Sequence, residues 1–304
     1  MTSFSVLICT YNRPDLLQIS LSALIDKTIE KPDQVVVVNG GDERSDSIVQ
    51  FFMDRPGITV ELIKTVNVNL ATSRNIGLVR CSGDFVAMTD DDAEVFPDWV
   101  TEMKRIHEEH PEAGAVGGAV LGADSDKSLL SRIADVATFS SPPEASYVRT
   151  LPGVNVSYKR LVLQKVGLQD ETLFRGEDVD FNWRVKLLGY EIYYTPEIKV
   201  IHHHRQTVKG FINQFYMYGR AYYLVRSKWP EMYCVYPLKI TRFHDLLKIL
   251  YFFVSSLFEP AQILTKLSAF KDKLFSLPIV YLLHLSWKIG VFQQALISKQ
   301  ETEC

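Results

Sequence analysis

An apolar run that ends in three consecutive carboxylates constrains this chain more than any other stretch. Residues 85–88 are apolar, and Asp90, Asp91 and Asp92 follow after a single threonine. The run predicts a buried strand that carries its polar end to the edge of a sheet. Three neighbouring carboxylates raise one another's pKa unless a cation lies among them, and such hard oxygen ligands suit Mg²⁺ or Mn²⁺. The alternative is an acidic turn that caps the next helix, since Asp is common at helix N-termini.

Short apolar runs alternate with helical patterns around this stretch. The runs are at residues 4–9, 34–38, 59–63, 85–88 and 115–120. Such alternation predicts an α/β sheet with right-handed crossovers, in which ligands bind beyond the carboxyl ends of the strands. Three runs end in polar residues, at 10–13, 39–41 and 90–92. We therefore expect these three segments to converge on one site.

The later part of the chain is less regular. Residues 122–147 show no clear pattern, and brief strands are predicted at 153–157, 192–194 and 198–201. Between them, an acidic segment at 176–180 leads into a helix with Phe181, Val185 and Leu188 on one face. Gly189 is predicted to end this helix.

Charge is unevenly distributed along the 304 residues, whose net charge is −3. From Lys199 onward there are 14 Lys and Arg against 6 Asp and Glu, whereas the first 198 residues have 19 against 30. The overall charge gives no case for binding nucleic acid. A basic, aromatic-rich last third instead predicts a surface that faces an anionic partner. The four cysteines form no CxxC pair, which fits a reducing compartment and argues against a zinc site or disulfide framework.

Eight segments match, in order, the pattern of a known family. They are Cys-Thr-Tyr-Asn-Arg at 9–13, Val-Val-Asn-Gly-Gly at 37–41, Ser-Arg-Asn-Ile-Gly-Leu at 73–78, the stretch with the Asp triplet at 83–92, Pro-Asp-Trp-Val at 97–100, Gly-Val-Asn-Val-Ser at 153–157, Gly-Glu-Asp-Val-Asp at 176–180 and Pro-x-Ile-x-Val-x-His at 196–202. The chain resembles the inverting, nucleotide-sugar-dependent glycosyltransferases of family two. This resemblance implies a GT-A (Rossmann-like) catalytic domain with a mixed, mostly parallel sheet at residues 1–205, and a helical extension at 206–304.

The resemblance also implies a binding site for a nucleotide-diphosphate sugar. The positions that match it are Thr10, Tyr11, Arg13, Asn39, Arg74, Asp90, Asp91 and Asn155. Thr10, Tyr11 and Arg13 match the base and ribose subsite, and Arg74 matches a position that reaches toward the base or the aspartates. Asn39 stands where the family usually has Asp, so the nucleobase is left open.

Metal ligation and catalysis follow from the same resemblance. Asp92 and His202 match metal-site positions, with Mn²⁺ or Mg²⁺ as the cofactor, and Asp178, beside Glu177, matches the catalytic base. A divalent cation neutralises the departing diphosphate, and a carboxylate removes the proton of the attacking hydroxyl. Without the resemblance, Glu177 and Asp178 fit an acidic first helical turn, and His202 fits a solvated strand end.

The last third suggests a membrane surface. Aromatic and basic residues interleave at 211–229, a pattern typical of membrane interfaces. The apolar stretches 246–258 and 274–297 are too short or too interrupted to predict a membrane span. We expect peripheral attachment to the cytoplasmic, anionic face of the cell membrane, with a lipid-linked or polysaccharide acceptor. The alternatives are a dimer interface, or helices that only pack on the catalytic domain.

Two other functions remain open at this stage. A sugar-1-phosphate nucleotidyltransferase shares the sheet architecture, but it should have a glycine-rich phosphate loop after the first strand, where residues 10–14 contain no glycine. A non-catalytic scaffold subunit with the same fold is disfavoured by the intact Asp triplet and by Glu177 and Asp178, whereas Asn39 leaves it possible.

Overall fold

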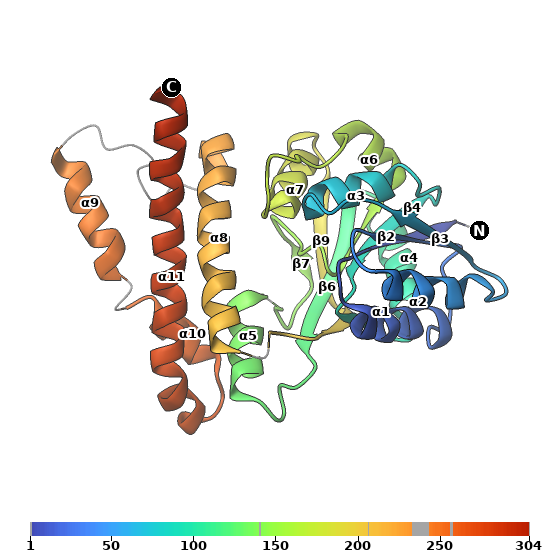
Figure 1. Cartoon of the computed structure of the whole chain (residues 1–304), viewed down its shortest axis with the longest axis horizontal. Coiled ribbons are helices and arrows are strands. Elements are labelled where there is room, and N and C mark those ends of the chain that lie inside the picture. The colour runs from blue at the N-terminus through green and yellow to red at the C-terminus, as the bar shows by residue number, and fades with distance from the viewer. Residues whose placement is uncertain (1, 140, 206, 233–242, 256–257, 304) are drawn as a thin grey trace. The chain divides into compact units, whose positions relative to one another are not determined.

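The structure, a computed structural model, describes residues 2–139, 141–205, 207–232, 243–255 and 258–303 (Figure 1). The chain divides into two compact units. The first comprises residues 1–123 and 139–203, and the second comprises 124–138 and 204–304. The second unit thus includes a segment, 124–138, that the sequence analysis assigned to the catalytic domain.

The first unit is built on one sheet, which has nine strands within the described residues. Its strands are β1 (Phe4–Thr10), β2 (Gln34–Asn39), β3 (Thr59–Lys64), β4 (Phe85–Asp90), β5 (Ala93–Val95), β6 (Ala113–Gly122), β7 (Ser146–Tyr147), β8 (Val156–Lys159) and β9 (Glu191–His202). Their order is β3-β2-β1-β4-β8-β6-β9-β5, and β7 pairs with β9. β1 to β4, β6 and β9 run in one direction, and β5, β7 and β8 run against them. This confirms the predicted mixed, mostly parallel sheet.

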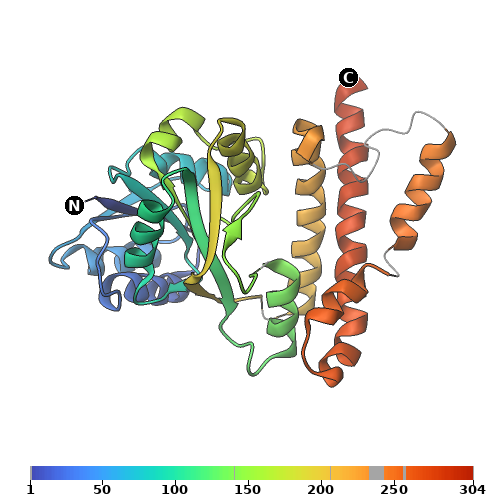
Figure 2. The ribbon, with the colours of Figure 1, turned by 180° about the vertical axis from the view of Figure 1, so that it is seen from behind.

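Helices cover both faces of this sheet (Figures 1 and 2). One face holds α1 (Pro14–Leu21), the π-helix η1 (Ser22–Asp26), α2 (Glu43–Met53) and α4 (Trp99–Glu109). The other holds α3 (Leu70–Leu78), α6 (Arg160–Val166) and α7 (Glu177–Leu187). The four valines of β2 run without interruption because both sides of the strand are buried. Val35 and Val37 pack against the first group of helices, and Val36 and Val38 pack against the second.

A bulge in β9 sets the position of its histidine. The two short strands expected at 192–194 and 198–201 are one strand, and its parallel pairing with β6 shifts register between Gly118 and Ala119. The bulge accommodates Pro196, which cannot donate to the ladder. Gly118 is required there, because a Cβ would lie 2.5 Å from the carbonyl oxygen of Thr195. Beyond the bulge, β9 continues to His202, which pairs with Ala93 of β5.

Other expectations were wrong in detail. The strand expected at 153–157 begins at Val156, and residues 122–147 contain α5 (Leu129–Thr138) and β7. Phe181 and Val185 are buried as expected, but Leu188 is 48% exposed because α7 ends at Leu187. Gly189 follows with φ +83°, as expected for a residue that ends a helix.

The second unit is helical. It contains α5, α8 (Val208–Lys228), the 3₁₀ turn η2 (Pro230–Met232), α9 (Phe243–Val254), α10 (Pro260–Lys266) and α11 (Phe270–Glu303). α8 and α11 pack closely at two glycines, Gly219 and Gly290, where a Cβ would overlap backbone of the facing helix. The stretch 274–297 was expected to be too interrupted for a membrane span. Within the described residues, however, Phe270–Ser298 of α11 is long and apolar enough, by length and composition only, to cross a membrane.

The bulge generates a testable expectation for Gly118→Ala. The added methyl group should clash with the β9 backbone, lower the free energy of unfolding by about 1–3 kcal/mol and displace His202. Urea unfolding measures the first effect and Mn²⁺ binding the second. Ser47→Ala, on the exposed surface of α2, is the control and should change stability by less than about 0.5 kcal/mol. Wild-type behaviour of Gly118→Ala would contradict the importance of the bulge.

Candidate metal and donor site

Asp90, Asp92 and His202 come together at the edge of the sheet. β4 ends at Asp90, and two residues later the chain enters β5, whose pairing with β9 aligns Ala93 with His202. The backbone N–H of His203 donates to the carbonyl oxygen of Asp92 at 2.9 Å, which fixes this crossing. One ligand atom from each of the three side chains lies within 4.8 Å of the others. Two carboxylates and one imidazole are ligands that Mn²⁺ accepts, so these three residues fit the Mn²⁺ expected from the sequence.

The aspartates of the triplet are not electrostatically equivalent. Burial raises the pKa of Asp90, and burial together with the charge of Asp92 raises the pKa of Asp91 to about 6. Burial would raise the pKa of Asp92 too, but the hydrogen bond from His202, the charge of His202 and that of Arg13 lower it below its usual value. Asp92 is therefore the member most strongly held as a carboxylate, which is the form that binds a cation.

His202 is not a solvated strand end. Its Nε2 lies 3.3 Å from Asp92 Oδ1, its side chain is largely buried, and Phe139 packs edge-on against its ring. Burial alone would lower its pKa, but the hydrogen bond and charge of Asp92 raise it. The next histidine, His203, lies 2.9 Å from Glu94 Oε1, so Asp92 just before β5 and Glu94 within it each face one of two consecutive histidines.

The end of β1 and the loop after it bind the triplet directly. The Arg13 guanidinium donates to Asp92 Oδ2 at 2.6 Å and to Asp91 Oδ1 at 3.1 Å, and the Thr10 hydroxyl donates to Asp91 Oδ2 at 2.7 Å. Tyr11, in contrast, is 51% exposed, so its ring is accessible to a ligand. Thr10 and Arg13 were predicted to contact the base and ribose, and in this structure they hold the aspartates.

Arg74 connects the triplet to the acidic start of α7. It is 4% exposed, and its guanidinium donates to Glu177 Oε1 at 2.7 Å and to Asp90 Oδ1 at 3.2 Å. Burial, followed by the charge of Asp178, raises the pKa of Glu177 to about 7. A Cβ at Gly153 would lie 2.5 Å from Arg74 Nη2, so a larger residue there would push the guanidinium from its position. Sequence reasoning assigned Gly153 no such part, because only the fold brings it against Arg74.

Asp178 differs from its neighbour Glu177. Its Oδ2 accepts from the Gly153 N–H at 3.1 Å and its Oδ1 accepts from the Val179 N–H at 2.8 Å. The side chain is only partly buried, whereas Glu177 is buried against Arg74. Of the two, Asp178 is therefore the carboxylate that a bound molecule can reach.

Two residues that were predicted to bind the nucleotide sugar, Asn39 and Asn155, make hydrogen bonds within the protein. The Asn39 amide donates to Asp42 O at 2.8 Å and to Asp46 Oδ1 at 2.7 Å, and its oxygen accepts from Gly41 N. Asn155 accepts from Trp99 Nε1 at 2.8 Å and donates to the carbonyl oxygens of Ala119 and Ile198. Both side chains are buried. These hydrogen bonds lie within the protein, and a contact of either residue with the nucleotide sugar stays a prediction.

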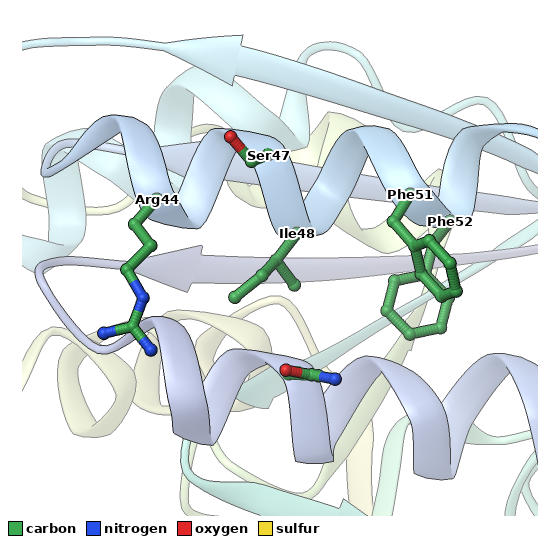
Figure 3. A pocket seen from close by; sticks show the side chains of 6 residues that line it. Arg44, Ser47, Ile48, Phe51 and Phe52 are labelled. Carbon is green, nitrogen blue, oxygen red and sulfur yellow. The ribbon is translucent and has the colours of Figure 1, made fainter.

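A surface pocket lies away from these residues. It is lined by residues of α1 and α2: Gln18, Arg44, Ser47, Ile48, Phe51 and Phe52 (Figure 3). None of the predicted site residues lines it. It therefore adds nothing to the metal and donor site.

Two family models match the chain. The model described as Glycosyl transferase family 2 matches residues 5–154, and the model described as Glycosyl transferase family group 2 matches residues 85–292. The second match covers more than half of the 304 residues and includes the site from Asp90 to His202.

Curated relatives and a solved structure agree with these matches. A Haloferax volcanii protein described as glucosyl-dolichyl phosphate glucuronosyltransferase is 31% identical over 184 residues, 57% of this chain and 58% of that protein. A Staphylococcus epidermidis protein described as poly-beta-1,6-N-acetyl-D-glucosamine synthase is 26% identical over 240 residues, 75% of this chain and 57% of that protein. The chain spans less than two thirds of the length of these relatives.

The structure of the mannosyltransferase PcManGT from Pyrobaculum calidifontis, in complex with GDP-Man and Mn²⁺, is similar in fold. Its TM-score is 0.67 at 17% identity, over 98% of this chain and 88% of that one. At this identity the likeness concerns the fold alone.

The burial of Asn155 leads to an expectation for Asn155→Ala. This change leaves the Trp99 N–H and two backbone carbonyls without their partner, so the free energy of unfolding should fall by about 2–4 kcal/mol. Urea unfolding measures it, with exposed Gln50→Ala on α2 as the control. Unchanged stability together with weaker donor binding would instead place Asn155 in the donor site.

Proposed function

We propose a reaction for this chain from its family: the chain belongs to glycosyltransferase family 2 and has the GT-A fold. The proposed reaction transfers a sugar from a nucleotide-diphosphate sugar to an acceptor hydroxyl with inversion. The observation that carries the proposal is the link from Asp90 through Arg74 to Glu177, the residue before Asp178. This link joins a cation-binding cluster to an accessible carboxylate within one unit, as donor activation and proton removal require.

The electrostatics of the cluster support a divalent cation. Five carboxylates, those of Asp90, Asp91, Asp92, Glu177 and Asp178, are gathered around two arginines and one histidine. Asp92 and His202 would hold Mn²⁺ or Mg²⁺, with Asp90 beside them. When bound, the cation neutralises the charge that develops on the departing diphosphate.

Asp178 is the proposed general base. Its two backbone hydrogen bonds orient the carboxylate while leaving it partly exposed, so an acceptor hydroxyl can approach it. A base that takes the proton of the attacking hydroxyl, on the side of the sugar opposite the diphosphate, produces inversion in a single displacement. Glu177 is proposed to position Arg74 rather than to take the proton.

The donor and acceptor are proposed at the level of chemical class. The fold neighbour holds GDP-Man, and one relative is described as acting with a dolichyl phosphate, which supports a nucleotide-sugar donor and a lipid-linked acceptor. The synthase among the relatives supports polysaccharide as the other acceptor class. Because Asn39 is buried in its own turn, it does not favour one nucleobase over another.

The second unit is the proposed membrane-facing part. α9 exposes four apolar or aromatic side chains at positions i, i+3, i+4 and i+7: Leu247, Leu250, Tyr251 and Val254. The opposite side of α9 is also apolar, since Phe252 is buried. An exposed apolar stripe of this kind marks a surface that lipid or another protein covers. Lys and Arg outnumber Asp and Glu from Lys199 onward, and exposed Lys248 lies beside the stripe. This positive charge suits an anionic bilayer surface at the cytoplasmic face of the cell membrane.

Incubation with UDP-, GDP- and dTDP-sugars, first with Mn²⁺ and then with EDTA, tests the proposed reaction. We expect release of a nucleoside diphosphate from one donor, and its loss when EDTA removes the metal. Turnover that depends on pyrophosphate would support a nucleotidyltransferase instead. No turnover with any donor, by protein that still binds Mn²⁺, would favour a non-catalytic subunit.

Asp178→Asn should separate proton removal from binding. The amide keeps the shape but cannot accept the proton, so kcat should fall by about 10²–10⁴-fold while donor and Mn²⁺ affinities stay near wild type. Steady-state kinetics and direct binding measure the two effects. Activity within a factor of about three of wild type would contradict Asp178 as the base.

Leu250→Glu should weaken lipid binding. The carboxylate lies in the exposed stripe of α9, so binding to phosphatidylglycerol vesicles at low salt should fall about tenfold, since burying a charge in a bilayer is costly. Gln262→Glu, exposed on α10, adds the same charge outside the stripe and should bind nearly as wild type. If wild-type protein binds no vesicles but is a dimer that Leu250→Glu dissociates, the stripe is a dimer interface.

A further inference from the structure

We propose that Arg13 is the internal counter-ion of the metal site, which a divalent cation must displace from Asp92, and that the displaced guanidinium then binds the diphosphate of the donor. This inference rests on the proposed function and concerns how that site is regulated. It makes metal and donor mutually dependent in binding. Nothing in the resemblance assigned Arg13 to the metal, since it was expected at the base and ribose.

Both carboxylate oxygens of Asp92 are occupied by groups of the protein. Oδ1 lies 3.3 Å from His202 Nε2, and Oδ2 accepts from Arg13 at 2.6 Å. The ligand atoms of Asp90, Asp92 and His202 are already within 4.8 Å of one another, so these three residues are gathered at one place before a cation binds. Arg13 is different, because its positive charge would lie directly against the incoming cation. The cation therefore competes with Arg13 for Asp92.

The surroundings of Arg13 allow it to move. Its side chain is 36% exposed, so part of it faces solvent rather than packed protein. Its second bond, to Asp91 Oδ1 at 3.1 Å, does not involve the metal cluster. Asp91 is itself held by the Thr10 hydroxyl, so it can keep Arg13 at the site after Asp92 is lost.

Arg74 provides the contrast. It is also paired with an aspartate of the triplet, but its side chain is 4% exposed and packs over Gly153. Its strongest contact is to Glu177 at 2.7 Å, away from the metal ligands. Of the two arginines at the site, only Arg13 is therefore both in the way of the cation and free enough of packing to leave.

The displacement has a thermodynamic consequence. Without donor, the cation must break the bond between Arg13 and Asp92, which weakens metal binding. With a diphosphate present, the guanidinium gains a bidentate anionic partner, and this loss is recovered. Metal and nucleoside diphosphate should then strengthen each other's binding by the same factor, because coupling between two ligands is reciprocal.

Mn²⁺ binding by Arg13→Gln tests this directly. Titration followed by the electron paramagnetic resonance of free Mn²⁺, with no nucleotide, should show about tenfold tighter binding than in wild type. A nucleoside diphosphate, UDP or GDP, should then tighten Mn²⁺ binding to wild type several-fold and to Arg13→Gln little. Arg44→Ala is the matched control, since it also removes one positive charge from the first unit but pairs with exposed Asp15. It should bind Mn²⁺ as wild type does.

The sign of the change decides the outcome. If Arg13 merely orders Asp92, Arg13→Gln binds Mn²⁺ more weakly, and this result, or an unchanged affinity, would overturn the proposal. If the glutamine variant unfolds, wild-type protein still decides, because Mn²⁺ binding that UDP or GDP does not tighten would overturn the proposal. Mn²⁺ affinity is read independently of turnover, so a protein that transfers no sugar still gives a clear answer about Arg13.

Discussion

The contact between Asp92 and His202 is the interaction on which the whole site depends. It joins a residue just beyond β4, in the middle of the sheet, to the last residue of β9, which lies more than 100 positions later in the chain. The short strand β5 makes the contact possible, because its antiparallel pairing aligns Ala93 with His202. The bulge beside Gly118 fixes which residue of β9 arrives there. A change of one residue in this register would turn His202 to the other face of the sheet.

Charge balance is the second constraint. Buried carboxylates are costly unless they are paired, and the protein gathers several at one place. Arg74, buried and paired with Glu177 and Asp90, acts as a permanent partner. Arg13 and His202 share Asp92 between them, and of these two groups the proposed cation replaces only Arg13. The aspartate triplet is thus paired with basic side chains of the protein itself.

The fold could be predicted from the sequence because its signals are local. Uninterrupted valines in β2, polar residues at the ends of β1, β2 and β4, and the matched segments all point to one sheet with a site at one edge. The side-chain contacts within that edge could not be predicted in the same way. Whether Asn39 and Asn155 face a ligand or the protein interior depends on Asp46 and Trp99, which only the folded chain brings beside them. Both asparagines lie inside matched segments, so a match of sequence did not reveal where their amides point.

The same limit applies to the loop after β1. Arg13 was assigned from its position in a matched segment, and its distance to Asp92 follows from how β1 and β4 pair in parallel, with Cys9 opposite Asp90. The irregular segment that contains α5 was also beyond prediction, since α5 is stabilised by packing on α8 and α11 rather than by its own sequence. Function is concentrated in such non-local contacts, which is why the site was predicted as a set of residues and not as a geometry.

Replacement of Asp92 with alanine, followed by assay of sugar transfer and of Mn²⁺ binding on the same folded protein, tests the central claim most directly. The account predicts loss of both, since the variant removes the one carboxylate that joins Arg13, His202 and the cation. Undiminished, metal-dependent transfer by a correctly folded Asp92→Ala protein would contradict it.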